Sequence, residues 1–137
     1  MKNLYFLIAT ILLIGFTACN NDDDNSSTQT LIGKWKFEQQ GYLINGQEIL
    51  EPYENDCPTK FDHVEFLNNG ITKDFYYGVD CREYVDNGTW SQSGNMLSLL
   101  FEDFQTQVEI LSLTNSSLKV KTIDEDNMVN ISILSRM

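Results

Sequence analysis

The stretch HVEFLNNGITKDFYY, residues 63–77, consists of two short segments on either side of an Asn-Gly pair. Apolar and polar residues alternate in the first segment, and Phe75 and Tyr77 share one face of the second. Alternation with a period of two predicts β-strands. Asn69-Gly70 favours a tight turn between them, because this pair readily adopts positive φ angles. The stretch therefore predicts an antiparallel β-hairpin.

The same pattern continues on both sides of this hairpin. On its N-terminal side, LIGKWKFE at residues 31–38 alternates, and the pair Asn45-Gly46 predicts another tight turn before a short strand. No long stretch of the domain shows the apolar period of a helix. The sequence therefore predicts an all-β domain of eight or nine strands, at residues 31–38, 47–51, 63–67, 71–77, 82–92, 96–101, 106–113, 117–123 and 128–134.

Mostly short loops join these strands in sequence order, as in an up-and-down antiparallel meander. Closing such a meander into a barrel removes the exposed strand edges that invite aggregation. A two-sheet β-sandwich is the alternative fold, but it needs longer crossing connections. Residues 52–60 provide one connection of that kind. We therefore expect a single up-and-down β-barrel.

Residues 1–18 have the organisation of a secretory signal peptide. A positive start at Lys2 precedes an apolar run, residues 4–16, that is short for a permanent transmembrane helix. The sequence FTAC at residues 16–19 resembles the bacterial lipobox, in which small residues precede an acylated cysteine. This resemblance implies cleavage before Cys19 and membrane anchoring through palmitate or similar chains on that cysteine. An uncleaved N-terminal anchor is the alternative.

Residues 19–30 begin with this cysteine and continue without any apolar residue. Such a segment cannot bury enough surface to become ordered, so we expect a disordered acidic tether. Asp22, Asp23 and Asp24 resemble the acidic tags that send some lipoproteins to the outer face of the outer membrane; a solvated spacer is the alternative. The expected location is the outer membrane of the cell envelope. If the three aspartates act as an export tag, the domain is displayed at the cell surface. The barrel domain then comprises residues 31–137.

The charge and the residue types narrow the classes of function. The chain carries 20 acidic and 9 basic residues, a formal net charge of −11. Nucleic acid would be repelled by such a chain. General acid–base catalysis with histidine has a single candidate, His63, on the polar face of its strand. We expect a monomeric, non-catalytic protein with no cofactor and no metal site.

Two cysteines remain once Cys19 is assigned to lipid. Cys57 and Cys81 form an even pair, which in an exported protein predicts a disulfide. A metal site is the alternative, and it would need more ligands at short spacing than His63 supplies.

A resemblance to the lipocalins begins at Gly33-x-Trp35 on the first strand. The order LIGKW, Cys57, FLNNG, Cys81, NGTW, SGNMLSL and EILSLTNSSLKV is similar to the small lipocalin-like domains of bacterial lipoproteins, over residues 31–133. The resemblance implies that Trp35 closes one end of the barrel beneath an arginine near the end of the last strand. Arg136 is the candidate for this cation–π stack, and Arg82 is the competing one.

Function depends on the barrel interior. The resemblance implies a non-catalytic barrel that binds a small apolar or amphiphilic ligand, and Lys73 is a candidate partner for a ligand carboxylate. The alternative is a filled barrel that presents its loops, especially residues 52–60, to protein partners. An enclosed cavity of roughly 300 Å³ or more is the physical basis of the ligand-binding interpretation, and its absence would remove that basis. The candidate lining residues are Trp35, Phe37, Val64, Phe66, Lys73, Phe75, Tyr77, Tyr84, Trp90, Leu97 and Leu99.

Overall fold

A computed structural model describes residues 31–102 and 104–137. The predicted signal peptide, the lipidated Cys19 and the acidic tether lie outside the described residues. Within the described part of the chain, no helix has the length and apolar character needed to cross a membrane.

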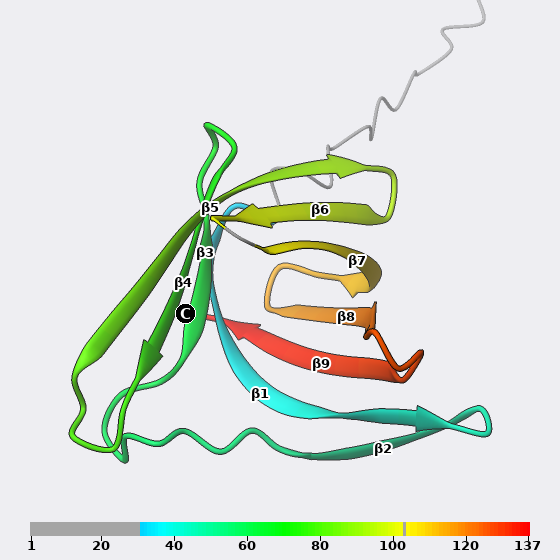
Figure 1. Ribbon diagram of the computed structural model, residues 1–137, viewed down its shortest axis with the longest axis horizontal. Helices are drawn as coiled ribbons and strands as arrows, with labels where there is room; N and C mark the ends of the chain where they lie inside the picture. The colour runs from blue at the N-terminus through cyan, green and yellow to red at the C-terminus, as the bar shows by residue number, and fades with distance from the viewer. Residues whose placement is uncertain (1–30, 103) are drawn as a thin grey trace, which may run out of the picture.

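The described residues form nine antiparallel strands in one sheet (Figure 1). All of them except β2 build a closed barrel, because β1 pairs with β3 on one edge and with β9 on the other. The predicted all-β barrel of the up-and-down type is confirmed. The strands are β1 (Gly33–Ile44), β2 (Gln47–Pro52), β3 (His63–Phe66), β4 (Ile71–Tyr77), β5 (Glu83–Ser93), β6 (Met96–Phe101), β7 (Phe104–Leu113), β8 (Ser117–Ile123) and β9 (Val129–Arg136).

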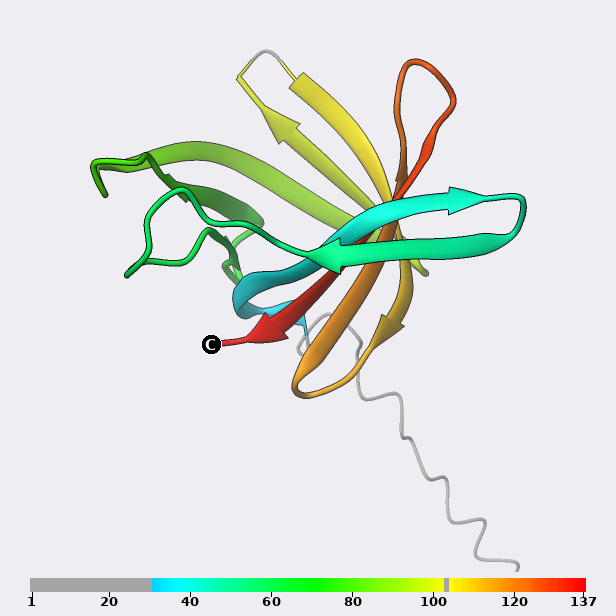
Figure 2. The same cartoon turned by 90° about the horizontal axis from the view of Figure 1, so that it is seen from below.

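Strand β1 is longer than the sequence pattern predicted, and it continues into the β2 hairpin. Asn45 and Gly46, with φ angles of 51° and 78°, form the expected two-residue turn. Lys119 Nζ of β8 lies 2.7 Å from Glu48 Oε2 of β2, although β9 and β1 separate these two strands in the sheet. The β1–β2 hairpin, the long arm in Figure 2, therefore comes close enough to β8 for an ion pair between them.

A cluster of apolar side chains fills one part of the barrel interior. Trp35 is fully buried, and its indole Nε1 donates a hydrogen bond of 2.7 Å to the Leu31 carbonyl oxygen. Trp90 Nε1 donates at 2.9 Å to the Leu67 carbonyl, and its ring packs edge-on against Phe66. Each buried indole therefore has both apolar contacts and a partner for its N–H group.

Arg136, at the end of β9, packs on the first strand. Its guanidinium carbon lies 4.2 Å from the centre of the Trp35 ring. Nη1 donates to the Ile32 carbonyl at 2.8 Å, and Nε donates to the Asn115 carbonyl at 2.7 Å. Gly33 has a φ of +132°, and a Cβ atom there would lie 2.6 Å from Arg136 Nη1. Glycine at this position therefore leaves room for the arginine.

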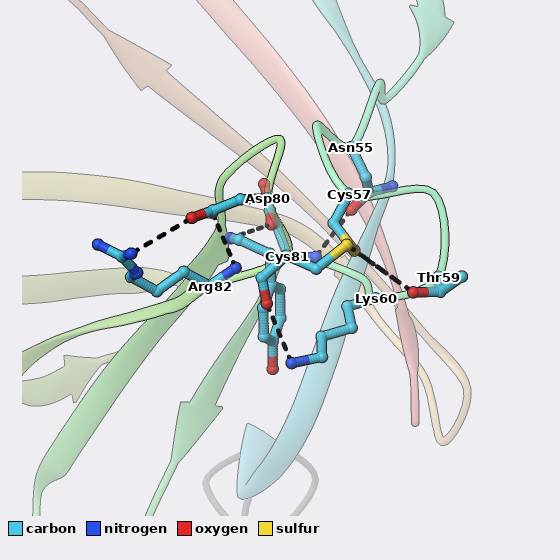
Figure 3. The surroundings of a disulfide bond; sticks show 9 residues. Asn55, Cys57, Thr59, Lys60, Asp80, Cys81 and Arg82 are labelled. Atoms are coloured by element: carbon cyan, nitrogen blue, oxygen red, sulfur yellow. Dashed lines mark hydrogen bonds and ion pairs between the residues drawn. A yellow bond between two sulfur atoms is a disulfide. The ribbon is translucent and has the colours of Figure 1, made fainter.

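The other candidate for this stack, Arg82, lies elsewhere in the structure. It is in the turn between β4 and β5, where its Nη2 lies 3.5 Å from Asp80 Oδ2 (Figure 3).

A disulfide joins the connection between β2 and β3 to the turn between β4 and β5 (Figure 3). Cys57 and Cys81 are bonded, with their Cα atoms 4.9 Å apart and 24 positions apart in the sequence. Lys60 Nζ also donates to the Cys81 carbonyl at 3.1 Å. The disulfide predicted from the cysteine count is confirmed, and it fixes the 53–62 segment to the neighbouring hairpin.

Removing this covalent link should destabilise the barrel measurably. We expect the double variant Cys57→Ala/Cys81→Ala to lose about 3 kcal/mol of unfolding free energy, because the open loop gains chain entropy in the unfolded state. Urea titration followed by tryptophan fluorescence measures this loss. The unmutated protein should lose a similar amount on reduction with dithiothreitol. An unchanged midpoint in both experiments would mean that non-covalent contacts alone hold the segment.

Candidate ligand-binding site

The interior of the barrel contains a cavity of about 240 Å³. Seven of the eight barrel strands contribute to its wall, and most of the side chains are apolar. The lining residues are Phe37, Val64, Phe66, Asp74, Leu97, Leu99, Phe101, Phe104, Thr106, Val108, Leu118, Val120, Thr122, Ser132 and Leu134.

The size of this cavity limits what it can hold. At about 240 Å³ it is smaller than the roughly 300 Å³ at which pockets for drug-sized ligands begin. It is larger than the roughly 150 Å³ apolar cavity that is known to bind benzene. The expected enclosed cavity of roughly 300 Å³ or more is therefore not found, and the space inside the barrel has room only for a more compact molecule.

The structure corrects one part of the predicted lining. Lys73, Phe75 and Tyr77 do not line the cavity, because they lie on the outer face of β4. In the register between β3 and β4, the inward-facing Val64 pairs with Asp74, and Phe66 pairs with Thr72. The alternating residues of β4 therefore point outward.

The turn between the two strands explains this difference. A two-residue Asn69-Gly70 turn would place Phe66 opposite residue 73. Instead, the Leu67 N–H donates to the Ile71 carbonyl, and three residues, 68–70, form the turn. Gly70 has a positive φ of 76°, whereas Asn69 is not among the described residues with positive φ. A shift of one residue in register exchanges the two faces of a strand.

The outward-facing aromatic rings of β4 are covered by other side chains. The Phe75 ring stacks on His63, with the ring centres 4.4 Å apart. Lys60 Nζ lies 4.9 Å from the centre of the Tyr77 ring, and Tyr77 is 9% exposed. These rings are buried outside the barrel rather than within it.

Tyr84 does not line the cavity either. It has the same parity as Trp90 on β5, but it lies near the start of the strand, where it pairs with Tyr76. The two rings stack 5.2 Å apart, and both are largely exposed.

The structure places Phe37, Val64, Phe66, Leu97 and Leu99 in the cavity wall. The predicted residues Trp35 and Trp90 belong to the adjoining core cluster. Sequence reasoning overlooked the contributions of the last three strands, although the alternation at residues 106–113, 117–123 and 128–134 contained the signal. These contributions are Thr106, Val108, Leu118, Val120, Thr122, Ser132 and Leu134.

Among the described residues, Asp74 is the one ionisable residue in the cavity wall. Burial raises the pKa of its carboxyl group from 3.8 to about 6. This value of the pKa includes smaller upward contributions from the nearby carboxylates of Asp86 and Asp62 and a downward one from His63. In the described part of the chain, no hydrogen bond or ion pair to the Asp74 carboxylate is found. Asp74 is thus a carboxyl group in a wall that otherwise suits apolar atoms.

The neighbouring Asp62 has a different role, because its hydrogen bonds are satisfied. Its Oδ2 accepts a hydrogen bond of 2.7 Å from the Tyr53 hydroxyl, and its Oδ1 accepts one of 3.0 Å from the Tyr77 N–H. Tyr53 in turn stacks on Phe37 of the cavity wall, with ring centres 5.1 Å apart. Asp62 therefore connects the 53–62 segment to β4 beside the cavity.

The raised pKa of Asp74 predicts a pH-dependent loss of stability. The Asp74 carboxyl group binds a proton more tightly in the folded state than in the unfolded state. Its protonation therefore stabilises the folded state at about pH 4, and this stabilisation is lost as the pH rises through 6. Asp74→Asn should therefore raise the free energy of unfolding by about 1–3 kcal/mol at pH 8 and by little at pH 4. Urea titrations at both pH values measure the difference between variant and unmutated protein.

Glu65→Gln is the matched control for this prediction. Glu65 lies on the outer face of β3, opposite Lys73. Its substitution removes the same charge from a site outside the cavity, and its effect at the two pH values is the baseline for the Asp74 variant. An equal effect of Asp74→Asn at pH 4 and pH 8 would contradict the assignment.

The fold and the cavity define a class of protein: a closed antiparallel barrel of eight strands with an apolar space inside. Comparison with family models identifies the family within this class. A model described as a lipocalin-like domain matches residues 31–120, and the chain belongs to this lipocalin-like family. Among curated proteins, no match to this sequence is found.

Solved structures agree with this fold. A lipocalin-like protein from Bacteroides uniformis aligns with a TM-score of 0.60 and 17% identity, covering 79% of this chain and 99% of that one. An uncharacterised protein from Bacteroides eggerthii gives a TM-score of 0.58 at 8% identity, covering 78% and 99%. Lobster apocrustacyanin A1 gives 0.53 at 18% identity, covering 80% and 62%. At these identities the similarity concerns the fold alone.

Proposed function

We propose that this chain is a lipid-anchored protein of the bacterial envelope whose barrel binds one small apolar or amphiphilic molecule without catalysing a reaction. The observation that carries the proposal is the cavity of about 240 Å³ inside the barrel. The atoms that line an empty apolar cavity lack the dispersion contacts that they would have in a filled core. A ligand of matching size restores those contacts.

General properties of the fold support this function. Barrels of about eight strands are wide enough to be filled by side chains or to hold one small ligand, as lipocalins do. In this chain the apolar side chains of Phe37, Val108, Leu118 and Val120 are among those that line the space. The proposed ligand occupies that space.

The first test measures binding of phenethyl alcohol, a compact neutral probe, to the chain from residue 20 onward. This piece contains every described strand and the whole described core, so it is the folding unit. NMR titration should give saturable shifts at Leu97, Leu99 and Val120. For a ligand of this size we expect a Kd of about 1 mM or below.

A pair of variants on β7 shows where the probe binds. Thr106 lines the cavity, and the neighbouring Gln105 is exposed. Thr106→Phe should fill the space and weaken binding at least tenfold, whereas Gln105→Phe should leave it within about twofold. If the unmutated protein shows no saturable shifts in the cavity wall, the proposed function is wrong.

The proposed anchor is an acylated Cys19 at the start of the mature chain. It would hold the barrel at the outer membrane. If the acidic tether acts as an export tag, the barrel would lie on the cell surface. The FTAC sequence at residues 16–19 supports it, and the disulfide suits an oxidising compartment outside the cytoplasm. Two or more acyl chains on one residue give stable membrane binding.

Substitution of the cysteine tests the anchor. Cys19→Ser should abolish incorporation of labelled palmitate and move the protein from the membrane fraction to the soluble fraction of its host. Cys57→Ser, which removes a cysteine of the barrel, should retain the label. Membrane association that survives Cys19→Ser would exclude the acyl anchor.

A further inference from the structure

The wall of the cavity distinguishes between ligands of opposite charge. Asp74 is the ionisable residue of the wall, and neither lysine nor arginine is among the lining residues. An ionised carboxylate in apolar surroundings is costly unless a partner compensates for the lost hydration. The described chain supplies no hydrogen bond or ion pair to this group. A partner brought by the ligand would remove that cost.

Other acidic groups surround Asp74. On β5, Asp86 lies directly opposite it, and from the β3 side Asp62 adds a second negative charge. His63, also on β3, is the neighbour with an opposing effect, and its ring is stacked on Phe75 outside the barrel. The field at the Asp74 end of the cavity is therefore negative.

The nearest cations face away from the cavity. Lys73 is next to Asp74 in sequence but points to the outer face of β4, opposite Glu65. Lys60 lies over the Tyr77 ring and donates to the Cys81 carbonyl. These lysines therefore do not neutralise Asp74 from within the cavity.

A second hollow adjoins the wall of the cavity. Its volume is about 400 Å³, and its wall contains Asp86 and Glu102. It shares Phe101 and Phe104 with the apolar cavity. A molecule whose apolar part lies among the cavity side chains can place a polar end beside Asp74, and the acidic groups of the adjoining hollow add to the negative charge nearby.

We propose that the ligand of the cavity is a small amphiphilic amine, with its apolar part inside the barrel and its ammonium group paired with Asp74. This inference rests on the proposed function and adds the charge of the ligand to it. An ammonium group donates charge-assisted hydrogen bonds to the carboxylate, and Asp86 adds attraction. A carboxylate ligand would be repelled by the same groups.

Three probes with the same ring and similar chain length test the proposal: phenethylamine, phenethyl alcohol and phenylacetate. Each is titrated by NMR at pH 7.5 into the chain from residue 20 onward. The amine should bind at least tenfold more tightly than the alcohol, and the carboxylate should bind more weakly than both. The preference for the amine should also decline as the pH falls through 6, where Asp74 becomes protonated.

Two variants assign the preference to a residue. Asp74→Asn should reduce binding of the amine to that of the alcohol, and should leave binding of the alcohol within about threefold. Glu65→Gln removes a charge from the outer face of the same hairpin and should preserve the preference for the amine.

The outcomes separate this inference from the proposed function. If the alcohol binds and the amine binds no better, the cavity is a ligand site but the amine proposal is wrong. If Asp74→Asn retains the full preference, the pairing with Asp74 is wrong. If none of the three probes binds, both the proposed function and the amine proposal fail.

Discussion

Closure of the sheet is the constraint on which the rest of the structure depends. The first strand and the last strand must meet, and the pairing of β1 with β9 brings them together. Arg136 reinforces this junction from the end of β9, because it stacks on Trp35 and donates to the Ile32 carbonyl. Gly33 makes the contact possible by leaving space where a side chain would collide with the guanidinium. Without this junction, the sheet would have two free edges and no enclosed interior.

The fold was largely predictable because alternation and turn residues are local signals. The pair Asn45-Gly46 forms the two-residue turn that its sequence predicts, and both residues have positive φ angles. The closing contact was implied only by the resemblance of Gly33-x-Trp35 to the lipocalins, which left both Arg136 and Arg82 as candidates. Strands and turns of this kind can be predicted without knowing which side chains cover each face of the sheet.

The inner face of β4 was not predictable in this way. The pattern Asn69-Gly70 allows turns of two or three residues, and the choice decides whether Lys73 or Asp74 faces the cavity. Hydrophobicity favoured the wrong face, because Phe75 and Tyr77 are more apolar than Thr72 and Asp74. In the structure, side chains outside the barrel bury those rings: His63 stacks on Phe75, and Lys60 covers Tyr77. The sequence pattern of a single strand does not show which distant side chains will cover its outer face.

The same one-residue difference in the turn sets the chemistry of the interior. It exchanges a cation for a carboxylate in the cavity wall, and it places Asp74 beside Asp62 and Asp86. Such groups repel one another, so they remain close only where the backbone around them is held. Asp62 is held by the Tyr53 hydroxyl and the Tyr77 N–H, and the Cys57–Cys81 disulfide ties its segment to the β4–β5 turn. These contacts therefore hold acidic groups close together at a cost in electrostatic repulsion, and a bound cation would reduce that cost.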